Sequence, residues 1–395
     1  MEMQALIMAG NGQPRFTAAR LSAFLGSPST CAAAPTPGPR PLIGVLAGSG
    51  IGPKVIGAAL TVLAAVEQAT GICFEIRHGG PIGAEAEARL GQSLPDSVAE
   101  FCAQVFQQGG AILSGPGGGR YVYDLRRRFD LFCKFVPIQP WPELAQAGRL
   151  APHHLRGVDI LLVRDNAAGV YQGRWQDRVV GGCRIAEHSF SYSEAQVRRI
   201  IEVAARAASR RRGRLHVVVK NGGVPSISAL WTEIGLDLAH QYRVEATLMN
   251  ADLAAYELIQ RPAQFDVMVA PNLLGDILAD VGGVLLGSRG VTFSGNFDGN
   301  GRAVYQANHG CAYDLAGTDV ANPAGQILSL AMLLRESFGL EEGAALVEKA
   351  LASAWRQGWR TADLAESGCQ VVGTRAMTDR LVEGIFHEAA TPRNA

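Results

Sequence analysis

The chain has 395 residues, of which 48% are hydrophobic and 18% are charged, and its formal net charge is zero. This length suffices for two lobes that each bury an apolar core, and the composition excludes a disordered protein. The balanced charge gives no indication of a nucleic-acid partner, and no apolar run approaches the roughly 18 residues that indicate a membrane span.

The cysteine pattern indicates a reducing compartment. Seven cysteines occur without a CxxC pair, and an odd number leaves no complete disulfide framework. Disulfides are rare in the cytoplasm, so we expect a cytoplasmic protein.

Residues 1–41 differ in composition from the rest of the chain. Ala, Pro, Ser and Thr dominate the stretch from Ser27 to Pro41, which has no hydrophobic periodicity. We predict that residues 1–41 form a disordered N-terminal tail.

Beyond this tail, short apolar runs alternate with helical stretches. The apolar runs predict buried strands at 42–46, 111–113, 158–163, 215–219, 244–249 and 267–270. Helical patterns lie at about 54–67, 193–211, 231–240, 254–260 and 324–334. An alternation of this kind indicates an α/β fold.

Glycine-rich turns follow the first two of these strands. Gly48, Gly50 and Gly52 form a GxGxG pattern, not the GxGxxG of dinucleotide-binding Rossmann folds, and residues 117–119 follow the second strand. The first pattern is equally typical of an ordinary strand-to-helix turn. The glycines alone therefore do not identify a nucleotide site.

A basic triplet, Arg126–Arg128, lies on a stretch that we predict as a helix ending near Pro137. Such a triplet is most often a solvated face. A guanidinium that points inward would instead hold a carboxylate through two hydrogen bonds. The sequence leaves both interpretations open.

Polar side chains follow two of the buried strands. Arg164 ends one strand, and Tyr171 stands in the glycine-flanked segment after it. Lys220 directly follows another strand in a chain with few lysines, the others being Lys54, Lys134 and Lys349. A lone lysine at a strand end, among glycines, is a candidate functional residue.

The stretch Asp266–Asp280 carries a pair of acids at helical spacing. Its apolar residues 267–270 are followed by Pro271 and by a helix on which Asp276 and Asp280 share one face. Like charges at this spacing repel unless a cation lies between them, and carboxylate oxygens suit Mg²⁺ or Mn²⁺. Two solvated acids on a surface helix are the alternative.

A long polar loop precedes the helix predicted at 324–334. It holds His309, Gly310, Asp314 and Asn322. A loop of this length and polarity favours ligand binding over packing.

Six motifs between residues 41 and 390 resemble, in this order, the metal-dependent β-decarboxylating dehydrogenases. That family includes isopropylmalate, isocitrate, homoisocitrate and tartrate dehydrogenases. The motifs are AGSGIGP at 47–53, LRRRFDLF at 125–132, VRDNAAGVYQG at 163–173, NLLGDILAD at 272–280, HGCAYDLAG at 309–317 and ANP at 321–323.

The resemblance implies a fold and an assembly. It implies an open two-domain α/β structure, not a Rossmann fold, in which the chain leaves the first domain and later returns to it. We expect the cofactor-binding first domain at 42–135 and 285–395. The second domain, at 136–284, is expected to hold the dimer interface, the catalytic lysine and metal ligands. Active sites in this family are shared between subunits, so a homodimer is implied.

The motifs also imply catalytic and metal-binding roles. Asp276 and Asp280 match the metal ligands of one subunit, and Asp252 matches the ligand that the second subunit supplies. Lys220 matches the catalytic lysine from that second subunit, and Tyr171 matches the catalytic tyrosine.

Substrate and cofactor residues follow from the same resemblance. Arg126 and Arg164 match arginines that hold the malate carboxylates. The adenosine-binding loop matches His309, Gly310, Asp314, Leu315 and Asn322. A carboxylate at 314 accepts bonds from ribose hydroxyls but repels a 2′-phosphate, so we expect NAD as the cofactor.

Several positions depart from the family's pattern. Val136 stands where an arginine is usual, which removes a charged partner and about 1.5–3 kcal/mol of interaction with the substrate. Lys134, where Asn is usual, is a candidate replacement for that charge. Ser49 and Leu253 also depart, and the Lys220 segment is longer than usual. These changes predict a specialised substrate.

The leading hypothesis is NAD- and Mg²⁺- or Mn²⁺-dependent oxidative decarboxylation of a 3-substituted malate to a 2-oxo acid and CO₂, in a specialised biosynthetic pathway. Lys220 would accept the hydroxyl proton, and Tyr171 would protonate the enol that remains after CO₂ leaves. The alternatives are a tartrate- or malate-type dehydrogenase of the same fold and a non-catalytic regulatory member of the family.

Overall fold

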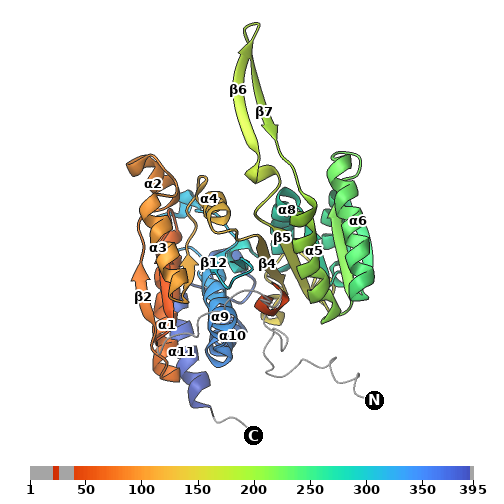
Figure 1. Cartoon of the computed structure of the whole chain (residues 1–395). Coiled ribbons are helices and arrows are strands. Elements are labelled where there is room, and N and C mark those ends of the chain that lie inside the picture. The colour runs from red at the N-terminus through yellow and green to blue at the C-terminus, as the bar shows by residue number, and fades with distance from the viewer. Residues whose placement is uncertain (1–20, 26–39, 392–395) are drawn as a thin grey trace.

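The computed structural model describes residues 21–25 and 40–391. Its frame is a ten-stranded sheet with the order β2-β1-β3-β12-β11-β4-β5-β10-β8-β9 (Figure 1). The predicted strands agree closely with those observed. The strands of this sheet are β1 (Leu42–Leu46), β2 (Glu75–His78), β3 (Ala111–Ser114), β4 (Cys133–Ile138), β5 (Ile160–Asp165), β8 (Arg214–Val219), β9 (Glu245–Asn250), β10 (Val267–Ala270), β11 (Phe293–Phe297) and β12 (Ala303–Ala307).

Two parallel groups of strands meet at an antiparallel centre. Strands β2, β1, β3 and β12 run parallel, as do β5, β10, β8 and β9. Between the groups, β11 pairs antiparallel with β12 and β4, and β4 pairs antiparallel with β5. The chain therefore leaves the first group after β3, builds the second, and returns through β11 and β12. The predicted α/β fold is confirmed, whereas the domain boundaries stay a prediction; the one at residue 135 falls within β4.

Helices lie on both faces of the sheet. Along β1, Ile43 and Val45 pack in the cluster that contains α1 and α9, and Leu42 and Leu46 pack on the other side against α3 and α4. The helices are α1 (Gly52–Thr70), α2 (Gly83–Leu90), α3 (Asp96–Gln107), α4 (Tyr121–Arg128), α5 (Glu194–Ser209), α6 (Pro225–Tyr242), α7 (Ala251–Gln260), α8 (Asn272–Leu285), α9 (Ala324–Phe338), α10 (Glu341–Arg356) and α11 (Thr374–Ala390). Nearly every residue of α9 is buried, so this helix forms the centre of the larger core.

The helix predicted through to Pro137 is wrong in its second half. Helix α4 ends at Arg128, Asp130 adopts a left-handed backbone with a φ of 48°, and residues 133–138 form β4. All of β4 is buried between β5 and β11. Packing in the centre of the sheet therefore overrides the local helical pattern.

A hairpin arm projects from the body of the molecule (Figure 1). It consists of β6 (Arg174–Val180) and β7 (Cys183–Ser189), which pair antiparallel. Gly181 and Gly182 turn the chain with φ of 58° and 81°, as a two-residue hairpin turn requires. At the base of the arm, the Arg120 guanidinium lies 4.5 Å from the centre of the Trp175 ring.

Part of the predicted disordered tail is packed. Residues Leu21–Leu25 form a short 3-10 helix, η1, which contacts α5 and α9 (red in Figure 1). Phe24 is 2% exposed, and Arg206 Nη1 donates to its carbonyl oxygen at 3.0 Å. Ser22 N donates to Glu336 Oε2 at 2.9 Å. The prediction of disorder is wrong for these residues, because a buried aromatic side chain anchors them; residues 1–20 and 26–39 lie outside the described part of the chain.

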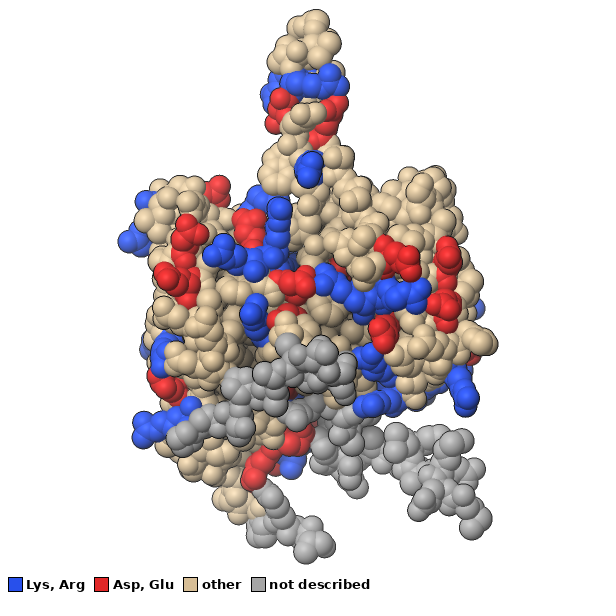
Figure 2. Space-filling view, viewed as in Figure 1, with Lys and Arg blue, Asp and Glu red and all other residues tan. Residues whose placement is uncertain are grey.

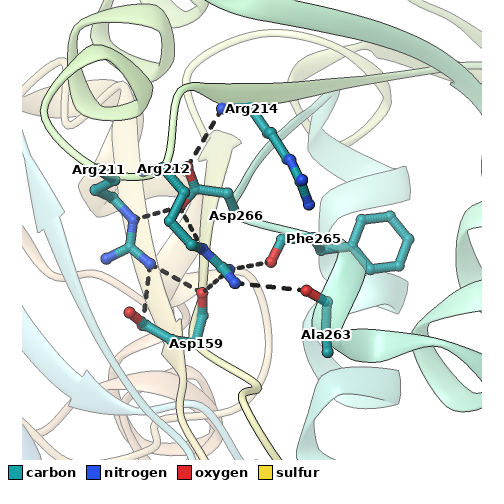
Figure 3. Close-up of polar contacts among 7 residues, drawn as sticks. All are labelled: Asp159, Arg211, Arg212, Arg214, Ala263, Phe265 and Asp266. Atoms are coloured by element: carbon teal, nitrogen blue, oxygen red, sulfur yellow. Dashed lines mark hydrogen bonds and ion pairs between the residues drawn. The ribbon is translucent and has the colours of Figure 1, made fainter. Parts of the chain in front are cut away.

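A network of charges fixes the strand ends that lie away from Arg164 (Figure 3). Asp266, which is fully buried, accepts from Arg211 Nε and from Arg212 N at 2.8 Å each. Both arginines also donate to Asp159 O, at 2.9 and 2.7 Å. The buried charge of Asp266 is thereby compensated, so this network stabilises the fold and leaves the other end of the strands for function.

The distribution of charge on the surface is mixed. On the face shown in Figure 2, basic and acidic side chains are interspersed, as the zero net charge leads one to expect. Nucleic-acid binding uses a continuous basic surface, and the described side chains on this face do not form one. Within the described residues, no helix is both long and apolar enough to cross a membrane.

Candidate active site

Arg164, Tyr171 and Asp276 meet at one end of the second group of strands. Arg164 lies near the end of β5, Tyr171 in a 3-10 turn, and Asp276 in α8. Arg164 Nη1 forms an ion pair with Asp276 Oδ1, and the Tyr171 hydroxyl donates to Asp276 Oδ2 at 2.8 Å. The Arg164 side chain is 1% exposed and that of Asp276 is 38% exposed. The carboxylate therefore has one buried side and one side open to a ligand.

Two glycines allow this close approach. A Cβ at Gly275 would lie 2.8 Å from Arg164 Cγ, so α8 can pack on that side chain only because position 275 is glycine. Gly169 adopts a φ of +75°, and a Cβ there would lie 2.3 Å from the Tyr192 hydroxyl oxygen. The local sequence therefore lets the Tyr171 segment and α8 close around Arg164.

Two further cations lie beside this cluster. Arg126 of α4 and Lys134 of β4 are each 3% exposed. Lys134 stands directly opposite Arg164 in the β4–β5 pair, and its Nζ donates to Asn308 Oδ1. The Nε of Arg126 is buried without a hydrogen-bond partner among the described residues. Buried positive charge thus exceeds the negative charge of Asp276.

The pKa shifts of the groups in this cluster reflect the same excess of buried positive charge. Burial lowers the pKa of Lys134 well below its ordinary value, and the neighbouring Arg126 and Arg164 lower it further. Burial, and then Arg164, lower the pKa of Arg126 to about 9. Burial alone would raise the pKa of Asp276, but Arg164 and Lys134 outweigh it and lower that pKa. A site with this balance favours an anion that brings more than one carboxylate.

Tyr171 is held as a proton donor. Burial, and then the hydrogen bond to Asp276, raise the pKa of Tyr171. Its ring centre lies 4.8 Å from that of Tyr123 on α4, and Arg120 Nη2 donates to its backbone carbonyl at 3.2 Å. The phenol is therefore protonated at neutral pH and fixed beside Asp276.

Sequence reasoning missed Asn272, the first residue of α8. Its Oδ1 accepts from Arg164 Nε at 3.3 Å and from Arg164 Nη2 at 2.8 Å. Its Nδ2 donates to Ala168 O at 2.8 Å. The available signal was an asparagine directly after a buried strand and a proline, because a buried amide needs partners on both of its ends.

The predicted metal ligands do not come together within one chain. Asp280 pairs with Arg289 at 2.9 Å, whereas Asp252 on α7 pairs with Lys220 at 2.7 Å. The Lys220 and Asp252 side chains are both exposed. No group of three His, Cys, Asp or Glu side chains in the described residues is placed to hold a metal ion. Asp276 and Asp280 offer the oxygen ligands that Mg²⁺ and Mn²⁺ favour, and a complete site needs a further ligand.

The residues predicted to bind adenosine lie beside the first glycine-rich turn. Ile51 N donates to Cys311 O at 2.9 Å, and a Cβ at Gly50 would lie 2.1 Å from the same oxygen. The two loops therefore form one continuous surface, on which Gly310 and Asp314 are exposed.

His309, Leu315 and Asn322 are less exposed parts of the same loop. The Nε2 of His309 is buried without a partner among the described residues, and burial lowers the pKa of His309. A neutral imidazole with a free nitrogen can bond to a ring such as adenine. Asn322 instead binds the fold, since its side chain accepts from Ala324 N and donates to Asp363 Oδ2 at 3.0 Å each.

Comparison with known proteins agrees with this geometry. The isocitrate/isopropylmalate dehydrogenase family matches residues 42–381. A 3-isopropylmalate dehydrogenase from Chromobacterium violaceum is 37% identical over 356 residues, which cover 86% of this chain and 99% of that protein. One from Aquifex aeolicus is 35% identical over 360 residues, which cover 87% of this chain and 96% of that protein. A solved isocitrate dehydrogenase from Methylococcus capsulatus is 28% identical with a TM-score of 0.77, covering 88% of this chain and 99% of that one.

These matches confirm the family resemblance that the motifs indicated. The family match begins at residue 42, so η1 lies outside it. The chain belongs to the isocitrate/isopropylmalate dehydrogenase family and is an enzyme of the decarboxylating dehydrogenase type.

Proposed function

We propose that the protein oxidatively decarboxylates a 3-substituted malate to a 2-oxo acid and CO₂, with NAD as hydride acceptor and Mg²⁺ or Mn²⁺ as metal, in a specialised biosynthetic pathway. The observation that best supports this proposal is the excess of buried positive charge at Arg126, Lys134 and Arg164 beside Asp276. A malate brings two carboxylates, which would neutralise this charge and give the buried Arg126 Nε an acceptor.

The side chains of this protein match the proton transfers that the reaction needs. Lys220 would accept the proton of the substrate hydroxyl, and bound NAD would supply the hydride acceptor for the hydroxyl-bearing carbon, so that the product of oxidation would be a 2-oxo acid with a β-carboxylate. Loss of CO₂ would leave an enolate, and Tyr171, protonated beside Asp276, would donate a proton to the enolate carbon to give the 2-oxo acid product. A bound Mg²⁺ or Mn²⁺ would supply Lewis-acid polarisation of the substrate oxygens, with Asp276 and Asp280 among its ligands.

In this proposal a second copy of the chain supplies Lys220 and Asp252. Within one chain these two side chains pair with each other at an exposed position and not with Asp276. Large apolar side chains are exposed on the neighbouring helices α7 and α8, namely Leu253, Tyr256, Ile277 and Val284. An exposed apolar surface of this kind favours an interface, and two-fold pairing would exchange Lys220 and Asp252 between subunits. These observations support a homodimer with shared active sites.

The exposed Asp314 supports NAD as the cofactor. It lies in the same loop as Gly310 and His309, beside the glycine-rich turn at Gly50. A carboxylate at this place can accept hydrogen bonds from the ribose hydroxyls, and it would repel the 2′-phosphate of NADP.

The substituent of the malate is expected to face Tyr123. Tyr123 precedes Arg126 by about one helical turn on α4, and its ring lies beside that of Tyr171. If Arg126 holds a substrate carboxylate and the reacting carbon lies at Tyr171, the substituent contacts the Tyr123 ring. An aromatic ring packs well against a flat or methylene-rich group. Together with Lys134 in place of Asn, this supports a substrate other than isopropylmalate.

The test is turnover across a panel of hydroxy acids. NADH formation and CO₂ release would be measured with Mn²⁺ and isopropyl-, benzyl-, carboxymethyl-, carboxyethyl- and phosphonomethyl-malate, with malate and tartrate, and with NADP in parallel. Lys220→Met, which cannot accept the hydroxyl proton, is the inactive control. Turnover of a 3-substituted malate with equal amounts of NADH and CO₂ supports the proposal. Turnover of tartrate or malate alone contradicts the proposal and favours a tartrate- or malate-type dehydrogenase. Binding of neither NAD nor Mn²⁺ contradicts it and favours a non-catalytic regulatory member of the family.

A further inference from the structure

A closed circuit of hydrogen bonds lies directly behind Arg164. Asp165, the last residue of β5, is fully buried, and its Oδ2 accepts from Ala168 N at 3.1 Å and from the Tyr192 hydroxyl at 3.3 Å. The same hydroxyl accepts from Asn272 N at 3.0 Å. Asn272 Nδ2 donates to Ala168 O at 2.8 Å and closes the circuit. We call Asp165, Ala168, Tyr192 and Asn272 the Asp165 circuit.

Each member of the Asp165 circuit is attached to a different part of the candidate active site. Asp165 follows Arg164 on β5, and Ala168 precedes the turn that carries Tyr171. Asn272 begins α8, on which Asp276 lies one turn later, and its Oδ1 also holds the Arg164 guanidinium. A single buried carboxylate therefore fixes the relative positions of the three elements that supply Arg164, Tyr171 and Asp276.

Tyr192 provides a hydrogen-bond acceptor that the first turn of α8 lacks. The first N–H groups of a helix have no partner within it, and α8 has no side-chain cap. The Tyr192 hydroxyl supplies the acceptor for Asn272 N from outside the helix. Its ring is held edge-on against the fully buried Trp231, with ring centres 5.6 Å apart. Gly169 leaves room for the hydroxyl, because a Cβ there would collide with it.

The carboxylate of Asp165 ionises at a higher pH than an exposed aspartate. Burial raises the pKa of Asp165 to about 6, while the hydrogen bonds from Ala168 and Tyr192 oppose that rise. Above this pH both donors face a negatively charged acceptor, which makes their hydrogen bonds stronger than neutral ones.

We propose that Asp165 and Tyr192 are positioning residues, which set the geometry of Arg164, Tyr171 and Asp276 for substrate and metal binding without touching either ligand. This inference rests on the proposed function. Loss of the Tyr192 hydroxyl would free the start of α8 and with it Asn272 and Arg164, so the site would have to be ordered by the ligands themselves. A variant without this hydroxyl should therefore bind substrate and metal more weakly, and saturating concentrations of both ligands should restore most of its turnover.

The experiment compares Tyr192→Phe with Tyr242→Phe in the full-length protein. Tyr242 is a matched control, because its hydroxyl also donates to a carboxylate, Glu202, and accepts from an N–H donor, Arg206, but lies away from the site. KM for the malate and half-saturation by Mn²⁺ would be measured together with kcat, Tm and the hydrogen exchange of the first turn of α8. Hydrogen exchange does not depend on turnover. A second pair, Asp165→Asn and Asp165→Ala, keeps or removes the acceptor oxygen.

We expect Tyr192→Phe to raise KM and the Mn²⁺ concentration at half-saturation roughly tenfold, because one buried hydrogen bond to a charged group is lost. Its kcat should stay within about threefold of the wild-type value. Faster exchange at the start of α8 should accompany this rise, and Asp165→Ala should show the same changes. Asp165→Asn should show them to a smaller extent, because its amide oxygen still accepts but carries no charge, and Tyr242→Phe should stay near wild type. A fall in Tm with unchanged KM would overturn the proposal and leave a purely structural role. If the wild type turns over no malate, the proposed function fails; unchanged hydrogen exchange in Tyr192→Phe would overturn the positioning role independently.

Discussion

Replacement of Lys134 by methionine should separate binding from stability. Methionine keeps most of the apolar stem of lysine and removes only the charge. Lys134 is 3% exposed, and burial, Arg126 and Arg164 lower its pKa. Burial and the neighbouring arginines disfavour this charge, so its removal relieves both costs. Loss of the hydrogen bond to Asn308 offsets about 1 kcal/mol of that gain, so we expect Lys134→Met to be as stable as the wild type or more stable.

The same change should weaken substrate binding. A hydrogen bond between an ammonium and a substrate carboxylate contributes about 1.5–3 kcal/mol, which corresponds to roughly 10- to 150-fold in Kd. Val136 cannot replace the charge, whereas Arg126 and Arg164 remain, so binding is weakened and not abolished. Because the pKa of Lys134 is lowered in the free protein, it loses its proton below the ordinary lysine pKa, and a bound carboxylate restores that proton. Binding above this lowered pKa should therefore take up protons.

Calorimetry tests both parts of this prediction. Titration with the active hydroxy acid in two buffers of different ionisation enthalpy gives Kd and the number of protons taken up, and urea unfolding gives stability. Lys349→Met, on the exposed side of α10, is the matched control. Lys134→Asn combined with Val136→Arg restores the usual family pair and should recover affinity. An unchanged Kd in Lys134→Met, or unchanged proton uptake, would refute the role of Lys134.

Substitutions at Phe24, in the Asp314 loop and at Asp165 probe three other parts of the molecule. Phe24→Ala should lower the free energy of unfolding by about 3 kcal/mol, measured by urea unfolding, and leave KM unchanged, because the ring is buried outside the site. Asp314→Lys with Leu315→Tyr should raise kcat/KM for NADP at least tenfold and lower it for NAD, because the repulsion of the 2′-phosphate is removed; unchanged cofactor preference would exclude this loop from adenosine binding. Burial raises the pKa of Asp165 from 3.8 to about 6, so the folded state binds more protons between these values and stability falls as pH rises. Asp165→Asn should remove about 2.4 kcal/mol of the fall in the free energy of unfolding between pH 4 and pH 7.

Residues at strand ends were the most predictable part of the site. Apolar runs identified β5 and β10, and the polar residues that follow them, Arg164 and the Asp276 helix, lie together as parallel neighbouring strands require. The family resemblance predicted Lys134 as a replacement charge, because it lies two residues before Val136 at a position where Asn is usual. Its placement opposite Arg164 depends on the register of β4, which the local sequence had predicted to be helical.

The remainder depended on contacts between distant segments. Tyr192 and Asn272 are far apart in sequence, and neither has a pattern that shows the shared hydrogen bond. Phe24 is a single aromatic residue near a polar, proline-rich stretch, so its burial could not be read from composition. The pairing of Lys220 with Asp252 likewise follows from the adjacency of β8 and β9, which only the sheet order reveals.

In the proposed homodimer, a complete active site combines Tyr171 and Asp276 of one copy with Lys220 and Asp252 of another. Asp276→Asn and Lys220→Met chains, each inactive alone, would be co-expressed with different tags, and mixed dimers would be isolated through both tags. One of the two sites in a mixed dimer is then intact, so we predict about half of the wild-type turnover of the active malate. Mixed dimers that are no more active than either parent would contradict the shared site. They would mean that Lys220 acts in the site of its own chain or takes no part in catalysis.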